Sequence, residues 1–204
     1  LSLLMFSCNF DINIGPGVKG NGNVTSAERR IEGNFNAIEI SKGLDVYLTQ
    51  SDTENLKVQA DENLHEIIIT EVKDNVLYIY ADENISYAAS KKVMLNFKNV
   101  SEIKATSGSD VYSTNTIVED KLKLVTTSGS DMELEVNTET LNCKSTSGSD
   151  LTIEGKASCS LLVENNFTLD ANDNTEINVY GNPKIEIRKF SGEAKLLKKL
   201  PLKK

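Results

Sequence analysis

Thr106-Ser107-Gly108-Ser109-Asp110 is the first of three copies of one pentapeptide, which recurs at residues 127–131 and 146–150. The central glycines of successive copies are 21 and then 19 residues apart, and an apolar residue follows each copy. Self-similarity at a nearly fixed period is typical of repeat proteins, in which every unit is one supersecondary element. The sequence therefore predicts structural units of about 20 residues.

Within each unit, apolar and polar residues alternate with a period of two, as in a strand with one buried face. Around the second copy, one parity holds Leu122, Leu124, Thr126, Ser128, Ser130, Met132 and Leu134. The other parity holds Lys123, Val125, Thr127, Gly129, Asp131 and Glu133. The alternation predicts that both serines of the motif point inward, whereas its threonine, glycine and aspartate point outward.

A unit of this size cannot bury its apolar face alone, but a stack of units can. Parallel stacking at about 4.8 Å aligns equivalent residues in columns. The alternative is an antiparallel sandwich or barrel, which turn signals about 8–12 residues apart also fit. Because only translation brings identical motifs together, we favour an all-β fold of the parallel β-helix or β-solenoid class, with rungs of about 20 residues stacked in the C-terminal half.

The rest of the chain extends this pattern less regularly. Degenerate copies of the motif occur at residues 42–46, 174–177 and 191–194, and apolar runs predict strands at 38–40, 44–48, 56–58, 67–69, 76–80 and 93–97. Lys73-Asp74-Asn75 predicts a hairpin turn, and residues 61–66 form at most one helical turn. No Pro- or Gly-rich linker separates the two halves, so we expect residues 24–195 to form a single domain.

The N-terminus, residues 1–8, is a short apolar run that ends in Ser7 and Cys8. It resembles the remnant of a bacterial lipoprotein signal peptide, in which the cysteine is acylated after export, and it is too short to span a bilayer. Residues 9–23 are polar and Gly-rich, as in a flexible tether. We expect an exported protein, lipid-anchored through Cys8 in the bacterial cell envelope at the outer membrane. The alternative is an apolar first strand with an incidental cysteine.

Two further cysteines, Cys143 and Cys159, remain. Export to an oxidising compartment would permit a disulfide between them. Both fall at inward positions of the alternation, where a thiol is a small apolar filler. We therefore expect them to be unbridged.

The net charge of −8 and the isoelectric point near 4.8 oppose binding to nucleic acid, because no basic surface is available to neutralise phosphates. The exception is the tail at residues 196–204, which is rich in Lys and Leu. Such a tail suits contact with an anionic lipid or a partner. A frayed end or a last capping strand fits it better.

Several motifs resemble, in the same order, the bacterial family called putative auto-transporter adhesin, head GIN domain. They are residues 20–24, 35–40, 43–50 and 58–64 and the Ser-Gly-Ser-Asp series. The resemblance covers roughly residues 20–195 and implies a right-handed β-helix-like fold in an exported lipoprotein, acting as an adhesin or surface scaffold. It carries over no catalytic residue. Asn165-Asn166-Phe167 and Asp173-Asn174-Thr175 depart from the family's Ser-Gly pattern, so we expect less regular last rungs.

Little in the sequence suits catalysis. His65 is the one histidine, and no Ser-His-Asp or Cys-His motif accompanies a nucleophile. Three scattered cysteines and one histidine do not make a zinc site. We therefore expect a protein that is not an enzyme and needs no cofactor. The rival hypothesis is a glycan-acting hydrolase or lyase on a β-helix scaffold, which would gather Asp or Glu with Arg, Lys or Tyr in a groove.

The motif aspartates Asp110, Asp131 and Asp150 should form an outward column, with Asp45 and Glu176 as further candidates. Stacked carboxylates repel, which raises at least one pKa, and a Ca²⁺ ion between them would relieve the repulsion. One carboxylate per rung supplies few ligands, so we prefer a role in which each aspartate satisfies turn N–H groups. The candidate binding face consists of Thr106, Asp110, Thr127, Asp131, Thr146 and Asp150. Its partner would be a surface glycan or protein, and self-association is also open.

Overall fold

A computed structural model describes residues 17–163, 166–171, 176–180, 184–190 and 195–198, with side chains described over residues 17–153. Its strands are β1 (Val18–Lys19), β2 (Val24–Arg29), β3 (Ala37–Ile40), β4 (Asp45–Gln50), β5 (Asn55–Asp61), β6 (Ile68–Lys73), β7 (Val76–Ala81), β8 (Ile85–Tyr87), β9 (Lys91–Phe97), β10 (Glu102–Thr106), β11 (Asp110–Ser113), β12 (Ile117–Thr127), β13 (Asp131–Ser145), β14 (Asp150–Val163), β15 (Asn166–Ala171), β16 (Glu176–Tyr180), β17 (Lys184–Phe190) and β18 (Lys195–Lys198). A single 3-10 turn, η1 (Glu62–Leu64), interrupts the strands within the described ranges. The prediction of an all-β fold is confirmed.

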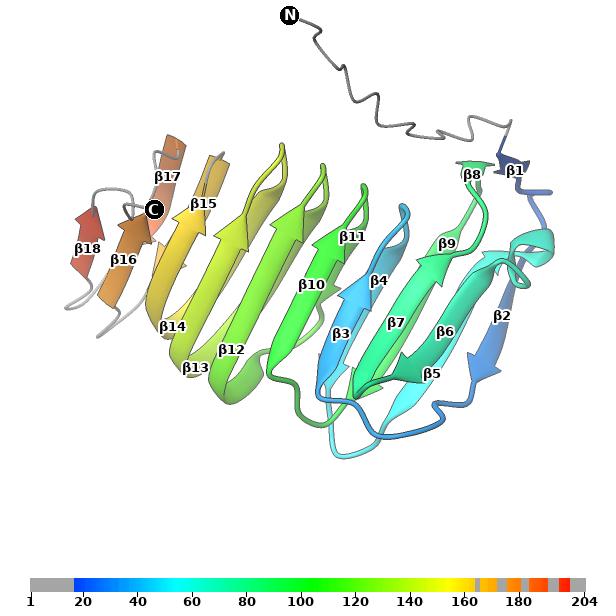
Figure 1. Cartoon of the computed structure of the whole chain (residues 1–204), viewed down its shortest axis with the longest axis horizontal. Helices are drawn as coiled ribbons and strands as arrows, with labels where there is room; N and C mark the ends of the chain where they lie inside the picture. Colours follow the sequence, from blue (N-terminus) through cyan, green and yellow to red (C-terminus); the bar gives the residue numbers. More distant parts are fainter. Residues whose placement is uncertain (1–16, 164–165, 172–175, 181–183, 191–194, 199–204) are drawn as a thin grey trace, which may run out of the picture.

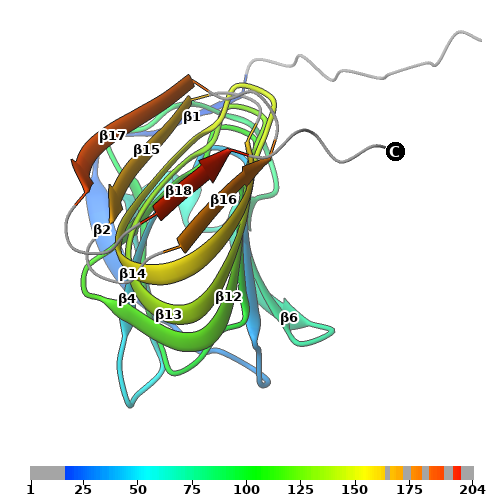
Figure 2. The same ribbon diagram turned by 90° about the vertical axis from the view of Figure 1, so that its left-hand side faces the viewer.

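Strands of successive repeats pair in parallel and in register, and they follow one another side by side along the long axis of the molecule (Figure 1). On one side β3, β10 and β12 are neighbours, and on the other side β4, β11 and β13 are neighbours. β13 pairs with both β11 and β12, so it bends from one side to the other. Viewed along the long axis, the strands curve around a shared interior (Figure 2).

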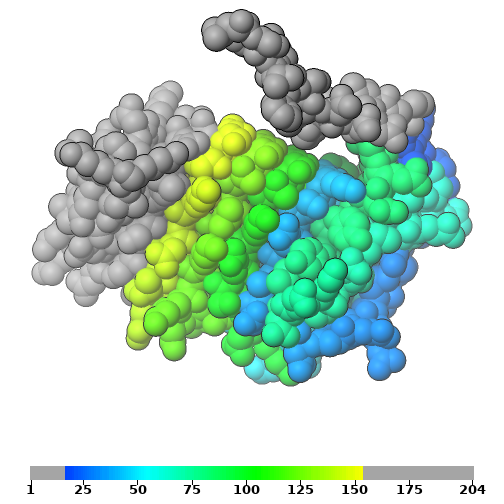
Figure 3. All heavy atoms as spheres, viewed as in Figure 1, coloured from blue at the N-terminus to red at the C-terminus, as the bar shows by residue number. Residues whose placement is uncertain are grey.

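The interior is a narrow stack of aliphatic rows. Val46, Val111, Met132 and Leu151 are in-register partners, and none of the four is more than 2% exposed. Cys143 is buried as the predicted apolar filler, and its partner on β14 is Leu161 rather than Cys159. In the space-filling view the layers form adjacent bands that run across the molecule (Figure 3).

The first layer of the stack is not the first in the sequence. β7 lies parallel to β3, and β9 lies parallel to β4, so the layer made by residues 76–97 precedes the layer made by residues 37–50. Beyond it, β6 runs antiparallel to β7. On the other side β5 runs antiparallel to β9, and β2 runs antiparallel to β5. These antiparallel strands cover the parallel edges at this end of the stack, which would otherwise expose unpaired backbone groups. The predicted hairpin turn joins β6 to β7, with Asp74 and Asn75 at φ 51° and 62°.

The Ser-Gly pair of each motif forms a tight turn in which both residues have positive φ. The values are 57° and 70° at Ser107 and Gly108, and Lys42-Gly43 adopts the same turn with 60° and 76°. The turn breaks the period of two, so the first serine is exposed while the second remains buried. The prediction that both serines point inward is therefore wrong for Ser107, Ser128 and Ser147.

The buried serine holds the turn together. The Ser130 hydroxyl accepts the N–H of Thr127 at 3.1 Å and lies 2.8 Å from the carbonyl oxygens of Thr127 and Ala105. Ser149 repeats this arrangement with Thr146 in the next layer. The hydroxyl thus bonds to the backbone of its own turn, and it also links one layer to the next.

We expect Ser130→Ala to destabilise the fold by about 1–3 kcal/mol, because it leaves buried backbone groups without a partner. Ser128→Ala, at the exposed first serine of the same turn, should change the free energy of unfolding by less than about 0.5 kcal/mol. Urea denaturation of the two variants measures the difference. Equal losses for both would support the original inward orientation of both serines.

The fold begins earlier than predicted. Val18 and Lys19, inside the predicted tether of residues 9–23, form β1 parallel to β8. The Gly22 N–H donates to the carboxylate of Asp61 at 2.8 Å. Cys8 and residues 9–16 of the predicted tether lie outside the described residues.

The last layers follow a different register from the one predicted. Leu151 pairs with Phe167, so Asn166 follows Asp150 in its row, whereas Glu176 pairs with Lys195. The prediction that Glu176 joins the aspartate column is therefore wrong. Of the two later degenerate copies, residues 174–175 of the first (174–177) and all of the second (191–194) lie outside the described residues. Strand β18 pairs with β16, so the tail predicted at residues 196–204 begins as a further strand of the stack.

Candidate functional site

The motif aspartates form the predicted column. Asp45, Asp110, Asp131 and Asp150 are in-register partners at the start of β4, β11, β13 and β14. Asp45 and Asp110 are half-buried, and Asp131 and Asp150 are exposed. The Asp131 carboxylate accepts the backbone N–H of Asp150 at 3.2 Å, which fits the preferred role of these residues as partners of turn N–H groups.

Asp110 lies in the column between Asp45 and Asp131. Its pKa is raised, first by burial and then by the charges of Asp131 and Asp45, while Lys91 and the N–H of Asp131 oppose the shift. Lys91 lies 3.6 Å from the Asp45 carboxylate, at the end of the column near β9. The expectation that at least one carboxyl of the column has a raised pKa thus agrees with the geometry.

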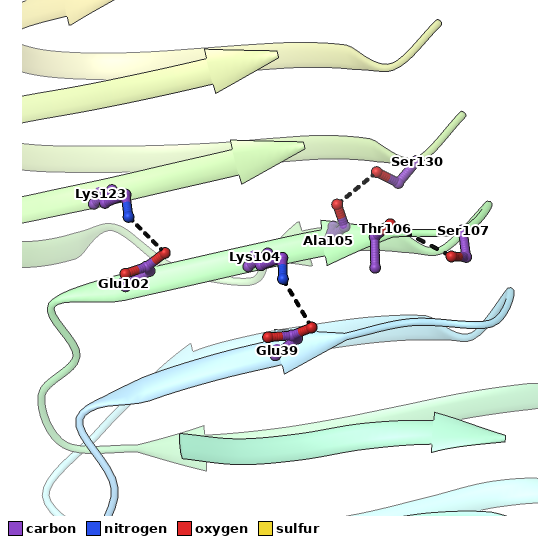
Figure 4. Close-up of polar contacts among 8 residues, drawn as sticks. All are labelled: Glu39, Glu102, Lys104, Ala105, Thr106, Ser107, Lys123 and Ser130. Carbon is purple, nitrogen blue, oxygen red and sulfur yellow. Dashed lines mark hydrogen bonds and ion pairs between the residues drawn. The ribbon is translucent and has the colours of Figure 1, made fainter. Parts of the chain in front are cut away.

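On the opposite side of the stack, lysine and glutamate side chains of neighbouring strands form ion pairs. Lys104 lies 2.9 Å from Glu39, and Lys123 lies 3.0 Å from Glu102, each across one step of the stack (Figure 4). Such surface pairs contribute little stability, about 0–1 kcal/mol each. Their effect is to leave the β3–β10–β12 side balanced in charge while the column makes the β4–β11–β13 side acidic.

We expect Asp110→Asn to stabilise the fold at pH 7, by less than about 1 kcal/mol because the site is partly exposed to solvent. A raised folded-state pKa means that ionisation is costly in the folded state, so the gain should shrink as the pH falls toward the ordinary aspartate value. Thermal unfolding across this pH range measures the effect, and Glu102→Gln on the balanced side is the control. Millimolar Ca²⁺ should leave the melting temperature unchanged, and a calcium-dependent rise that Asp110→Asn abolishes would instead establish a metal site.

The threonines of the predicted binding face are less accessible than expected. Thr146 is only 9% exposed and donates to the Thr127 hydroxyl at 3.0 Å, so its predicted outward orientation is wrong. Thr106 lies with its hydroxyl 3.4 Å from that of Ser107 (Figure 4). These hydroxyls link neighbouring residues and layers, so Thr146 drops out of the predicted face, whereas Thr106 and Thr127 stay half-buried like Asp110.

An aromatic pair beside the column was missed by the sequence analysis. Tyr47 and Tyr112 stack with ring centroids 5.3 Å apart and an angle of 23° between the rings. Lys92 lies 5.5 Å from the centroid of Tyr47. Both tyrosines lie two residues after a column aspartate, so alignment of the degenerate copy at residues 42–46 with the first motif would have found them. Together with the column they form what we call the acidic face: Asp45, Asp110, Asp131, Asp150, Tyr47 and Tyr112.

No group of three or more His, Cys, Asp or Glu side chains is placed to hold a metal ion in the part of the chain that the structure describes. The weak calcium candidates Asp110, Asp131 and Asp150 are not such a group. His65 lies at the end of the stack that the antiparallel strands cover. Its Nε2 is 3.0 Å from the Thr25 hydroxyl, and its carbonyl accepts a hydrogen bond from the Arg29 guanidinium. A groove that gathers carboxylates with lysine and tyrosine, the feature expected of the glycan-acting rival, does occur beside β8, and it borders the acidic face through Lys91, which pairs with Asp45.

Comparison with known proteins identifies the family. The family model described as putative auto-transporter adhesin, head GIN domain, matches residues 34–191, well over half of the chain. The chain belongs to this family. The GIN-domain resemblance predicted from the sequence motifs is thereby confirmed, and the family description concerns adhesion rather than catalysis. No curated protein matches the chain.

Solved structures share the fold. A putative adhesin from Bacteroides fragilis superimposes with a TM-score of 0.72 at 19% identity, covering 91% of this chain and 97% of that one. A putative adhesin from Parabacteroides merdae gives a TM-score of 0.56 at 19% identity, covering 89% and 98%. A putative lipid binding protein from Parabacteroides distasonis gives 0.56 at 18% identity, covering 89% and 98%. At such identities the likeness extends to the fold.

Among the residues that the structure describes, no helix has the length and apolar character needed to cross a membrane.

Proposed function

We propose that this protein is a non-catalytic adhesin or surface scaffold of the bacterial cell envelope. In this proposal residues 24–195 form a single domain, a right-handed parallel β-helix closed at one end by antiparallel strands, which presents its acidic face to a surface glycan or protein. The carrying observation is the in-register row Asp45–Asp110–Asp131–Asp150, which repeats one chemical group on successive layers. A stack of this kind is a stiff, nearly one-dimensional scaffold with extended faces.

The two sides of the stack differ in a way that supports a binding role for one of them. Carboxylates on the β3–β10–β12 side are paired with Lys104 and Lys123, whereas on the acidic face burial first, and then the charges of Asp131 and Asp45, raise the pKa of Asp110. A fold under selection for stability alone has no reason to keep this repulsion, because it costs stability. Complementary charge on a partner would relieve it and would guide association.

The proposed anchor is a lipid on Cys8, which would hold the protein in the outer membrane. The sequence supports it through the apolar run before Cys8 and the polar residues after it. Residues between Cys8 and Gly17 span at most about 30 Å when fully extended, so the β-helix would stay close to the bilayer surface. A single acyl chain binds membranes only weakly, and stable anchoring needs a second lipid chain or another contact.

Binding of the full-length chain to a glycan array and to epithelial cells tests the proposed function. We expect binding that falls about tenfold or more in the double variant Asp110→Asn, Asp131→Asn. The double variant Lys104→Gln, Lys123→Gln, on the balanced side, should bind like the wild type. Absence of wild-type binding to every glycan and cell type would refute an adhesin role.

We also expect Cys8 to be acylated in a bacterial host. Metabolic labelling with an alkyne fatty acid should tag the wild-type chain, expressed with its signal peptide, and should leave Cys8→Ala untagged. Cys143→Ala is the matched control and should be labelled like the wild type. Equal labelling of the wild type and Cys8→Ala would exclude Cys8 as the anchor.

A further inference from the structure

A cleft of about 790 Å³ lies where the regular turns of the stack are interrupted. In the next two layers the chain reverses through the tight turns Lys42-Gly43 and Ser107-Gly108. In the first layer β7 and β9 are joined instead by residues 82–90, which contain β8. β8 and the tight turns lie along the same edge of the molecule (Figure 1), and the cleft is lined by both.

The long connection is held in place by backbone hydrogen bonds to the N-terminal segment. The Val18 N–H donates to the Asn84 carbonyl, and the Gly20 N–H donates to the Tyr87 carbonyl, both at 2.7 Å. The Ser86 hydroxyl donates to the Gly17 carbonyl at 2.9 Å. β1 therefore fastens the wall of the cleft in one position.

Asp61 fastens the other end of the connection. Its fully buried carboxylate accepts the N–H groups of Ala89 and Ser90 at 3.0 and 2.9 Å, and also that of Gly22. Burial acts to raise the pKa of this carboxyl, but the backbone donors outweigh it, and the pKa lies below its usual value. A Cβ at Gly20 would lie 2.1 Å from the Asp61 carboxylate, so this anchorage requires glycine there. The cleft is thus preorganised, which spares a ligand the cost of ordering it.

The lining of the cleft is polar and balanced in charge. Lys42 and Lys91 contribute two positive charges, and Asp82 and Glu83 contribute two negative charges. Lys42 also crosses the cleft and donates to the Asp82 carbonyl at 3.3 Å. Neither an anion nor a cation meets a uniform countercharge here, whereas hydroxyl groups can donate to the carboxylates and accept from the ammonium groups.

Tyr87 adds an apolar surface to the same cleft. At 59% exposure it is the most exposed large apolar side chain within residues 17–153. Its backbone is fixed by the bond to Gly20, so its ring stands on a rigid strand. An exposed aromatic ring with one apolar face and a polar tip is enriched at binding sites.

We propose that this cleft binds a neutral saccharide. In this arrangement the Tyr87 ring packs against the C–H face of a sugar, and its hydroxyls bond to Asp82, Glu83 and Lys42. The cleft volume lies within the range of about 300–1,000 Å³ that is usual for small-molecule sites. The inference rests on the proposed adhesin function and names a ligand class for it, at a site other than the acidic face.

The same residues argue for binding rather than hydrolysis. A glycosidase needs one carboxylic acid kept protonated by burial, opposite a second, ionised carboxylate. Asp82 and Glu83 are both solvent-exposed and adjacent in sequence on one wall of the cleft. They suit hydrogen bonding to hydroxyls, which needs only ionised oxygens.

Calorimetric titration of the full-length chain with a panel of neutral di- to tetrasaccharides of hexoses and N-acetylhexosamines tests the inference. Uronic acid and sulfated oligosaccharides of the same lengths serve as charged probes. We expect binding of a neutral probe that Tyr87→Ala weakens about tenfold or more and Glu83→Gln also weakens. Tyr78→Ala, an aromatic truncation on β7 outside both the cleft and the acidic face, should bind the neutral probe like the wild type, and Tyr112→Ala reports on the acidic face. Unchanged melting temperatures should accompany the substitutions at Tyr87 and Glu83, because both side chains are exposed.

The outcomes separate this inference from the proposed function. Binding lost in Tyr112→Ala but kept in Tyr87→Ala would overturn the cleft and leave an adhesin that uses its acidic face. Failure of every neutral probe, or preference for a charged one, would overturn the saccharide inference, and cell binding would then decide the function on its own. Release of new reducing ends from a neutral probe would overturn both proposals in favour of a glycan-acting enzyme.

Discussion

The hydrogen bonds between the buried serines Ser130 and Ser149 and the backbone of their own turns are the contacts on which the stack depends. The equivalent Ser109 accepts from the Gly43 N–H of the neighbouring layer. A parallel stack needs each layer to reverse at the same place, or the register of all later layers is lost. The Ser-Gly pair makes the reversal in two residues of positive φ, and the inward hydroxyls of Ser130 and Ser149 bond to the N–H and the carbonyl of the turn threonine. Once the turns are aligned, the aliphatic rows and the aspartate column follow from the register alone. The side chains of the acidic face are therefore positioned by a feature of the interior.

Repetition made part of this architecture predictable. Three copies of one motif indicated parallel units, and period-two alternation placed Leu124, Met132 and Cys143 inside. The alternation failed at Ser107 and its equivalents, because it assumes an uninterrupted strand and cannot register a turn of positive φ. It failed again beyond Asp150, where the spacing changes and Glu176 falls out of the row. The strands β5 and β6 were predicted, but the antiparallel pairing of β2 and β5 beside β9 and the strand β1 were not, because these pairings depend on contacts between residues far apart in sequence.

The candidate sites illustrate the same division. The aspartate column repeats, so the sequence located it, and Tyr47 and Tyr112 could have been found by aligning the degenerate copy. The cleft beside β8 arises where residues 82–90 replace a tight turn of the repeat, and the motif turns Lys42-Gly43 and Ser107-Gly108 form part of its lining. The repeated surface is acidic and extended, and the interrupted surface is balanced in charge and concave. A repeat protein thus offers a second kind of site wherever its repeat is broken, and such a site becomes visible only once the chain is folded.

The short ladder between β1 and β8 has a mechanical consequence. A force applied to the chain before Gly17 would act first on the hydrogen bonds between β1 and β8, and through them on the segment that carries Tyr87. The next contact is the Asp61 carboxylate, which accepts hydrogen bonds from the N–H groups of Gly22, Ala89 and Ser90. Tension would therefore act on the wall of the cleft before it reached any layer of the stack. Load on the tether and the shape of the cleft would be coupled, so a pulled molecule and a relaxed one would present different surfaces at this edge.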